Sequence, residues 1–201
     1  MNWYKISQKE DWYNLSSATR LNTSPEILAK ILEKENDDFI SWSAARHPNC
    51  PAEVLVKILE KENNDQVSIN AAANLNCPPE VLSKVLEKGN NDQVSINVAA
   101  NPNCPPEALA KVLERGKNDQ ASFYVAKNPN CPPNALAKVL TRGKDDFVSQ
   151  LAAENPNCPF RAKIDWMRAV GQIKTEDENS ILEEQDKPDN SDLEKFKDLL
   201  K

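Results

Sequence analysis

The chain has 201 residues and a mass of 22.5 kDa, enough to bury the core of one or two domains. Its 25 basic and 31 acidic residues give a formal net charge of -6, and its mean hydropathy is -0.66. No stretch approaches the roughly 18–20 consecutive apolar residues of a membrane-spanning helix, and residues 1–7 lack the apolar core of a signal peptide. We therefore expect a soluble, cytoplasmic protein with reduced cysteines and no membrane partner.

Five cysteines recur at a fixed interval of 27 residues, and Thr23 stands one interval before the first of them. They are Cys50, Cys77, Cys104, Cys131 and Cys158. Such a period is the sequence signature of a solenoid, whose short units bury their apolar faces against one another. We count Thr23 or the cysteine of each unit as position zero. The expected segments are a cap and half repeat (1–22), five repeats (23–157), a capping helix (158–171), an acidic linker (172–190) and a short amphipathic helix (191–201).

The first part of each unit predicts an amphipathic helix. Position zero is expected to be its N-cap, followed by proline at the first helical position and glutamate at position three, as in Thr23–Glu26 and Cys50–Glu53. Apolar residues at positions four, five, eight and nine form one buried stripe. At position twelve, Gly89, Gly116 and Gly143 are expected to end the helix in the left-handed conformation. Glu35 and Glu62 replace glycine in the first two units, so the sequence specifies the helix end less strongly there.

The second part of each unit predicts a shorter helix. Its N-cap is the aspartate at position fifteen, and its buried face lies at positions seventeen, eighteen, twenty-one and twenty-two. The N-caps are Asp38, Asp65, Asp92, Asp119 and Asp146. Serine at position eighteen and alanine at twenty-two indicate close approach to a neighbouring helix. An Asn-Pro-Asn sequence then ends the helix, and His47 replaces the first of these asparagines in one unit, where we expect it to keep their role in the turn.

These columns resemble the leucine-rich repeat variant family over residues 11–170. The resemblance rests on the run Val98-Ala99-Ala100-Asn101-Pro102-Asn103-Cys104-Pro105-Pro106-Glu107-Ala108-Leu109 and its copies. It implies an all-α fold: a right-handed α-solenoid, or superhelix, of 27-residue two-helix repeats that alternate an α-helix with a short α or 3₁₀ helix. The unit is a few residues longer than usual in that family, and cysteine stands where threonine is common. Function varies across the family, so the resemblance implies a fold and little more.

We expect no metal site, no cofactor and no enzymatic activity. Thiolates that bind zinc or an iron–sulfur cluster converge on one centre and usually come in closely spaced pairs. Residues in one column of a solenoid are instead about 8–10 Å apart, one helix spacing, so the cysteines are interpreted as small, half-buried cap residues. The sequence offers no Ser-His-Asp set and no glycine-rich phosphate loop.

Position seven holds a column of lysines that could track nucleic-acid phosphates. The column is Lys30, Lys57, Lys84, Lys111 and Lys138. Glutamates stand four residues before or three residues after these lysines, so we expect ion pairs within each helix and a charge-balanced face. Binding to nucleic acid is therefore disfavoured.

The second helices carry the more informative candidate site. An apolar and aromatic strip at positions sixteen, nineteen and twenty, rimmed by polar side chains, is typical of a protein-binding groove. The candidate partner-binding residues are Phe39, Trp42, Ile69, Ile96, Phe123, Tyr124, Phe147 and Leu151. Burial of position nineteen in the core is the alternative interpretation.

The ends of the chain differ from the repeats. Trp3, Tyr4, Trp12 and Tyr13 are predicted to cover one end of the stack and Trp166 the other. Residues 172–201 hold ten of the acidic and five of the basic residues, and their last part offers a candidate contact through Leu193, Phe196, Leu199 and Leu200.

The sequence favours a non-catalytic interaction module or scaffold that binds a protein through the second-helix groove. Two alternatives stay open. One is nucleic-acid binding or mimicry, including a phage-type inhibitor of a host protein. The other is a structural subunit of a larger assembly.

Overall fold

The structure is a computed structural model, and it describes residues 20–173. Within this range the chain forms eleven α-helices, α2 to α12, and no strand. The first helix of each unit is α2 (Pro25–Leu32), α4 (Ala52–Glu60), α6 (Pro79–Glu87), α8 (Pro106–Glu114), α10 (Pro133–Leu140) or α12 (Phe160–Ala169). The second is α3 (Phe39–Arg46), α5 (Gln66–Ala73), α7 (Gln93–Ala100), α9 (Gln120–Lys127) or α11 (Phe147–Glu154).

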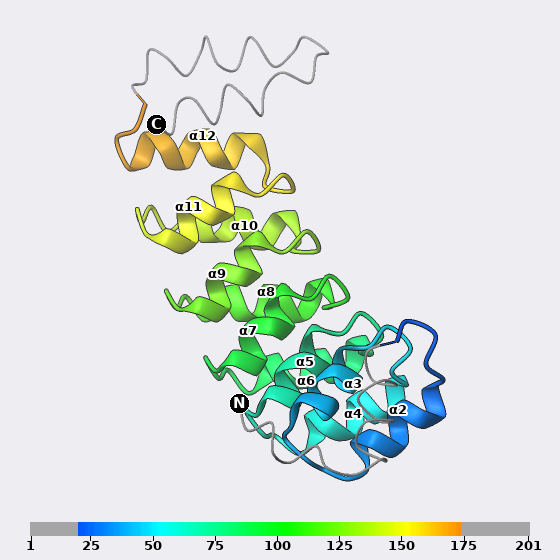
Figure 1. The fold of residues 1–201 in the computed structure, drawn as a ribbon. Helices are drawn as coiled ribbons and strands as arrows, with labels where there is room; N and C mark the ends of the chain where they lie inside the picture. Colours follow the sequence, from blue (N-terminus) through cyan, green and yellow to red (C-terminus); the bar gives the residue numbers. More distant parts are fainter. Residues whose placement is uncertain (1–19, 174–201) are drawn as a thin grey trace.

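The helices form an elongated stack that runs from α2, in blue, to α12, in orange (Figure 1). Helices α3, α5, α7, α9 and α11 pack side by side in one layer, and α4, α6, α8, α10 and α12 pack in the other. The first and second helices within a unit also contact each other. Residues 20–173 are therefore an all-helical repeat structure. All second helices in the described range are short α-helices, so the 3₁₀ alternative does not occur there.

The first helices begin one residue later than predicted. Their N-caps are the residues at position one, Ser24 or a proline such as Pro51, and none makes a side-chain capping hydrogen bond. A proline at position two follows Ser24, Pro78, Pro105 and Pro132 and disfavours the helical ψ at position one, where ψ is 149°, 141°, 140° and 143°. The capping role predicted for position zero is therefore wrong. The cysteines are buried in the core rather than half-buried at a helix end.

The predicted helix ends at position twelve are confirmed. Gly89, Gly116 and Gly143 have positive φ angles of 71°, 67° and 61°. Glu35 and Glu62 take the same left-handed conformation, with φ of 53° and 60°, although a Cβ atom disfavours it. The backbone at this turn is therefore the same whether glycine is present or not.

The predicted second helices are confirmed in their caps and buried faces. Each aspartate at position fifteen accepts a hydrogen bond from the main-chain N–H of the serine at position eighteen, as Asp92 does from Ser95 at 2.8 Å. Position seventeen is buried in four units, but in the first unit Ile40 is only half-buried. Positions eighteen, twenty-one and twenty-two are buried in every unit, and alanine at twenty-two is fully enclosed. These small residues allow neighbouring second helices to approach closely.

Hydrogen bonds from one asparagine column connect the units. This asparagine ladder consists of Asn74, Asn101, Asn128 and Asn155 at position twenty-four. Each buried side-chain amide donates to two main-chain oxygens of the preceding unit, at 2.6–3.1 Å. Its oxygen accepts from the N–H two residues further on. Each amide thus uses both of its N–H donors and one of the two lone pairs of its oxygen. These bonds fix the register of adjacent units.

The two ends of the ladder use other side chains. His47 accepts from the N–H of Asn49 through Nδ1 at 3.0 Å, and its Nε2 lies 2.6 Å from the oxygen of Arg20. These partners assign the proton to Nε2, and they confirm the predicted role of His47 in the turn. At the other end, the buried Lys163 donates to the oxygen of Asn155 at 3.1 Å, where a further asparagine would otherwise donate. Burial lowers the pKa of Lys163.

The C-terminal cover of the stack is Trp166, as predicted. Its side chain is buried, and its indole N–H donates to the oxygen of Lys144 at 2.8 Å. The aromatic residues predicted to cover the other end, Trp3, Tyr4, Trp12 and Tyr13, lie outside the described residues. The candidate tail contacts Leu193, Phe196, Leu199 and Leu200 also lie outside them.

Candidate functional site

The second helices present one outward stripe, at positions sixteen, twenty and twenty-three. In chain order its members are Phe39, Ser43 and Arg46; Gln66, Asn70 and Ala73; Gln93, Asn97 and Ala100; Gln120, Tyr124 and Lys127; and Phe147 and Glu154. Position twenty of the last unit, Leu151, is buried and does not belong to the stripe. We call this stripe, together with the half-buried residues Trp42, Ile69 and Phe123 at position nineteen, the second-helix surface. It is the part of the described chain where exposed aromatic side chains gather.

Phe39, Tyr124 and Phe147 are the exposed members of the predicted site, with 50%, 45% and 52% of their surfaces accessible. Trp42, Ile69 and Phe123 are half-buried and pack against the core. Position nineteen is therefore neither wholly groove nor wholly core, because it lies between the outward stripe and the helix face that contacts the neighbouring second helix.

Ile96 and Leu151 are buried and are not surface residues. Ile96 lies at position nineteen, beside the interhelix contact, and Leu151 belongs to the continuous apolar core. A period in the sequence places both on the correct side of a helix, but it does not show how far neighbouring side chains cover them.

Aromatic side chains meet at the two ends of the surface. On α3, the rings of Phe39 and Trp42 are 6.5 Å apart and edge-on, and the Trp42 indole N–H donates to Asp37 at 2.5 Å. On α9 and α11, the rings of Phe123 and Phe147 are 4.8 Å apart, with an interplanar angle of 88°. Such edge-to-face pairs stabilise each other beyond simple burial, so their exposed parts are held in fixed positions.

Between the aromatic ends lies an uncharged amide region. Neither α5 nor α7 contains a charged residue. Asn70 donates to the oxygen of Trp42 at 3.1 Å, and Asn97 donates to that of Ile69 at 3.4 Å. The sequence places these asparagines at a polar rim, whereas the structure places them in the middle of the surface, joined to the preceding helix.

The first helices present a charged face. Lysines at position seven pair with glutamates of the preceding unit: Lys84 with Glu60 at 3.6 Å, Lys111 with Glu87 at 2.9 Å and Lys138 with Glu114 at 3.0 Å. The expectation of pairs within each helix is therefore wrong for these three lysines. Glutamates of the adjacent unit are in reach because the helices stack side by side.

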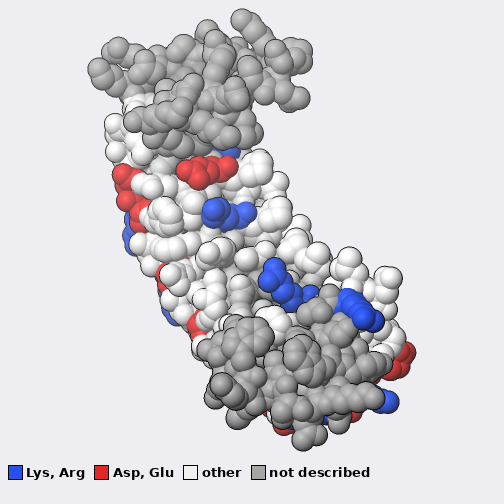
Figure 2. All heavy atoms as spheres, in the orientation of Figure 1, with Lys and Arg blue, Asp and Glu red and all other residues white. Residues whose placement is uncertain are grey.

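Charge and hydrogen bonding hold these pairs in place. The hydrogen bond and positive charge of Lys111 hold the pKa of Glu87 below its usual value. Figure 2 shows a face of the molecule that is mostly uncharged, with acidic and basic side chains alternating along its left-hand edge. Charges of both signs thus lie close to one another.

The cysteine column forms part of the core. All five thiols are buried and free, and burial raises the pKa of Cys50, Cys77, Cys104 and Cys131 to about 12 and that of Cys158 to about 11. Thiols with such pKa values stay protonated at neutral pH, and the protonated form is a poor nucleophile and metal ligand. Residues 20–173 contain no group of three or more His, Cys, Asp or Glu side chains arranged to hold a metal ion.

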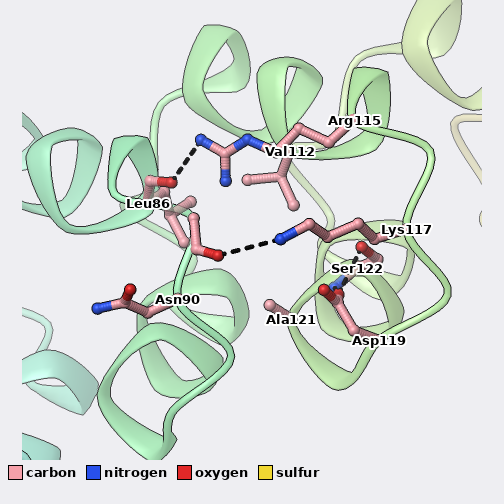
Figure 3. Close-up of a pocket in the computed structure, with 9 residues that line it drawn as sticks. Leu86, Asn90, Val112, Arg115, Lys117, Asp119, Ala121 and Ser122 are labelled. Carbon is pink, nitrogen blue, oxygen red and sulfur yellow. Dashed lines mark hydrogen bonds between the residues drawn. The ribbon is translucent and has the colours of Figure 1, made fainter.

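Small hollows lie between the turns of adjacent units. Figure 3 shows one of them, where Arg115 donates to the oxygen of Leu86 at 2.9 Å and Lys117 donates to that of Gly89 at 3.3 Å. It has about 10 Å³ of room for water-sized molecules, and a related hollow beside Lys61 has about 90 Å³. These volumes suit one or a few waters rather than a small-molecule ligand.

Sequence reasoning missed two exposed apolar residues. Leu21 and Leu75 are 77% and 63% accessible. Leu75 stands in the Asn-Pro-Asn turn, where other units have proline, and this departure from the column is the signal that could have identified it.

No helix among residues 20–173 is long and apolar enough to cross a bilayer. No protein-family model, curated protein or solved structure matches this chain.

Proposed function

We propose that this protein is a non-catalytic interaction module that binds a protein partner through the second-helix surface. The scaffold in this proposal is a right-handed superhelix of five 27-residue units, related to the leucine-rich repeat variant family. The resemblance supports the scaffold, and the exposed side chains of the second helices support the function.

The observation that carries the proposal is the exposure of Phe39, Tyr124 and Phe147 on a rigid scaffold. Aromatic side chains are enriched among the residues that supply most of the binding energy in protein interfaces. They lose little conformational entropy on binding when they are already held, as Phe147 is by its contact with Phe123. The adjacent units are themselves fixed by the asparagine ladder.

The charged face of the first helices supports the same proposal by weakening a nucleic-acid alternative. Lys84, Lys111 and Lys138 each face a glutamate of the neighbouring unit. A phosphate would have to displace that carboxylate and would meet its negative charge. A ladder of lysines paired in this way is a poor track for a polyanion.

Site-specific photo-crosslinking tests the proposal. A photo-reactive phenylalanine analogue is placed at Tyr124 in the full chain, and at Lys111 on the first-helix face as the matched control. After exposure in an extract of native cells, we expect one protein to be crosslinked at Tyr124, and unlabelled full chain should compete for it. Equal crosslinking at Lys111, or crosslinking that the full chain does not compete for, would contradict the proposal.

A further inference from the structure

We propose that the second-helix surface binds an extended, uncharged segment of a protein that carries an apolar anchor at each end. In this arrangement the glutamine amides of the surface bind the main chain of the segment, and the two aromatic ends contact the anchors. The inference rests on the proposed function, and it adds the conformation and the charge of the partner.

The middle of the second-helix surface lacks charge. Helices α5 and α7 carry no charged residue, and α3, α9 and α11 carry one each, at their last residue: Arg46, Lys127 and Glu154. A charged side chain placed over the middle of the surface would lose hydration and find no opposite charge in return. The middle of the surface therefore selects an uncharged segment.

A row of glutamine amides crosses the second-helix surface. Gln66, Gln93 and Gln120 occupy position sixteen of three successive units, and all three are exposed. The side chains of Gln93 and Gln120 make no hydrogen bond within the described part of the chain, and Gln66 makes only a long one, 3.4 Å, to Asn70. Each amide thus offers both a donor and an acceptor to a ligand.

The conformation of the ligand follows from that chemistry. An extended segment leaves its main-chain N–H and C=O groups open to such amides, whereas a helix uses them internally. Adjacent packed helices lie about 8–10 Å apart, and an extended chain rises about 3.3 Å per residue, so one unit spans roughly three residues. Phe39 stands three units before Tyr124 and four before Phe147. The anchors are therefore expected roughly 9–12 residues apart.

Asn70 and Asn97 prepare the surface for such a ligand. The amide of Asn70 donates to the oxygen of Trp42 at 3.1 Å, and that of Asn97 makes a longer contact, 3.4 Å, with the oxygen of Ile69. Both amides are thus directed toward the preceding helix. A surface whose side chains are fixed in advance binds an extended segment at a smaller entropic cost.

Selection from a phage-displayed library of random peptides of about 16 residues, long enough for both anchors, tests the inference on the full chain. We expect enriched peptides with two apolar anchors separated by uncharged residues. Selected peptides are then synthesised and titrated against the full chain and its Gln93→Glu and Gln93→Ala variants. Lys84→Gln, on the first-helix face, is the matched control.

We expect Gln93→Glu to weaken peptide binding about tenfold or more, because a carboxylate cannot donate to the main chain and is desolvated. Gln93→Ala should weaken binding less, and Lys84→Gln should leave it unchanged. Failure to enrich peptides, charged residues between the anchors, or binding that Gln93→Glu leaves intact would overturn the inference. The inference would also be overturned if the full chain binds single-stranded polythymidine and Gln93→Glu weakens that binding.

A separate variant distinguishes failure of the inference from failure of the proposed function. The partner that crosslinking identifies is purified, and its binding to Tyr124→Ala and to Gln93→Glu is measured. If Tyr124→Ala abolishes this binding while Gln93→Glu leaves it unchanged, the aromatic surface binds a partner of another shape. The proposed function then stands, and the inference about an extended segment fails.

Discussion

The side-chain amide of Asn101 donates to the main-chain oxygen of Asn74, its counterpart one unit earlier, at 3.1 Å. The same amide donates to the oxygen of Ala72 at 2.8 Å, and its own oxygen accepts from the N–H of Asn103. One side chain therefore closes its own turn and joins two units. Repetition of this contact makes the array a continuous scaffold for the second-helix surface.

Replacing Asn101 with alanine should destabilise the protein by about 2–4 kcal/mol, because several buried main-chain groups lose their partners. Asn101→Asp should be similarly harmful, because a carboxylate cannot donate to the two oxygens. Urea denaturation followed by circular dichroism measures the free energy of unfolding. Asn64→Ala, at an exposed turn position, is the control. A loss at Asn101 no greater than at Asn64 would refute the role of the ladder.

Gly89, at position twelve of the third unit, adopts a positive φ. The absence of a Cβ atom at Gly89 also leaves room for the side chain of Arg115. A Cβ atom at Gly89 would lie 2.8 Å from Nη1 of Arg115, whose guanidinium donates to the oxygens of Leu86 and Glu87. Gly143 has a similar φ, and the described part of the chain places no atom within 4 Å of such a Cβ.

Gly143→Ala should therefore cost about 1 kcal/mol, from the left-handed backbone alone. Gly89→Ala should cost about 1 kcal/mol more, because Arg115 must move away from its acceptors. A double-mutant cycle with Arg115→Ala measures the coupling in chemical denaturation. If the cost of Gly89→Ala is the same with and without Arg115, the contact contributes nothing.

Buried serines at position eighteen differ in their partners. The hydroxyl of Ser122 donates to Asp119 at 2.7 Å, whereas the buried hydroxyl of Ser95 has no hydrogen-bond partner among residues 20–173. Ser122→Ala should cost about 1 kcal/mol, and Ser95→Ala should be neutral or stabilising by up to about 1 kcal/mol, because it removes an unsatisfied polar group. Melting temperatures of the two variants compare the sites directly. Equal losses would mean that the hydroxyl of Ser95 is satisfied.

The cysteine column is expected to lower the free energy of unfolding as the pH rises through the alkaline range. In the unfolded chain a thiol ionises near its ordinary pKa of about 8.5, whereas Cys104 and Cys131 have pKa values of about 12 in the folded protein. The raised folded pKa means that the contribution to stability is complete below about pH 8.5 and is lost as the pH rises toward 12. At about pH 10 the loss is about 2 kcal/mol per thiol.

Removing thiols should therefore reduce this dependence on pH. The free energy of unfolding is measured by urea denaturation under reducing conditions at about pH 8 and about pH 10. The original chain is compared with the double variant that carries Cys104→Thr and Cys131→Thr. Threonine occupies the same column at Thr23, so it is the conservative replacement. The variant should lose about 4 kcal/mol less between the two pH values. Equal losses would show that the two thiols titrate normally.

Local patterns predicted much of the fold. The aspartate caps of the second helices, the turn role of His47 and the left-handed residues at position twelve each depend on a few neighbouring residues, and all three are confirmed. The predicted cap at position zero is wrong because, in most units, a proline at position two disfavours the helical ψ of the residue before it, so the helix begins one residue later.

Features that depend on the distance between units could not be predicted in this way. The partner of Lys111 is Glu87 on the neighbouring helix, and the amide of Asn101 reaches across to Asn74. Likewise, the burial of Ile96 and Leu151 depends on how closely adjacent second helices pack. Periodicity identifies the face of a helix, but coverage of that face is a property of the assembled stack.

The most direct test of the proposed function uses the partner that crosslinking identifies, purified without the crosslink. Its affinity is measured for the original chain and for matched surface variants. Tyr124→Ala with Phe147→Ala removes exposed aromatic area, and Lys84→Ala with Lys111→Ala alters the first-helix face to a similar extent. By isothermal titration calorimetry, we predict that the aromatic pair weakens binding at least about tenfold, with little change in melting temperature, while the lysine pair has no effect. Unchanged affinity in the aromatic variant, or an equal loss in the lysine variant, would contradict binding through the second-helix surface.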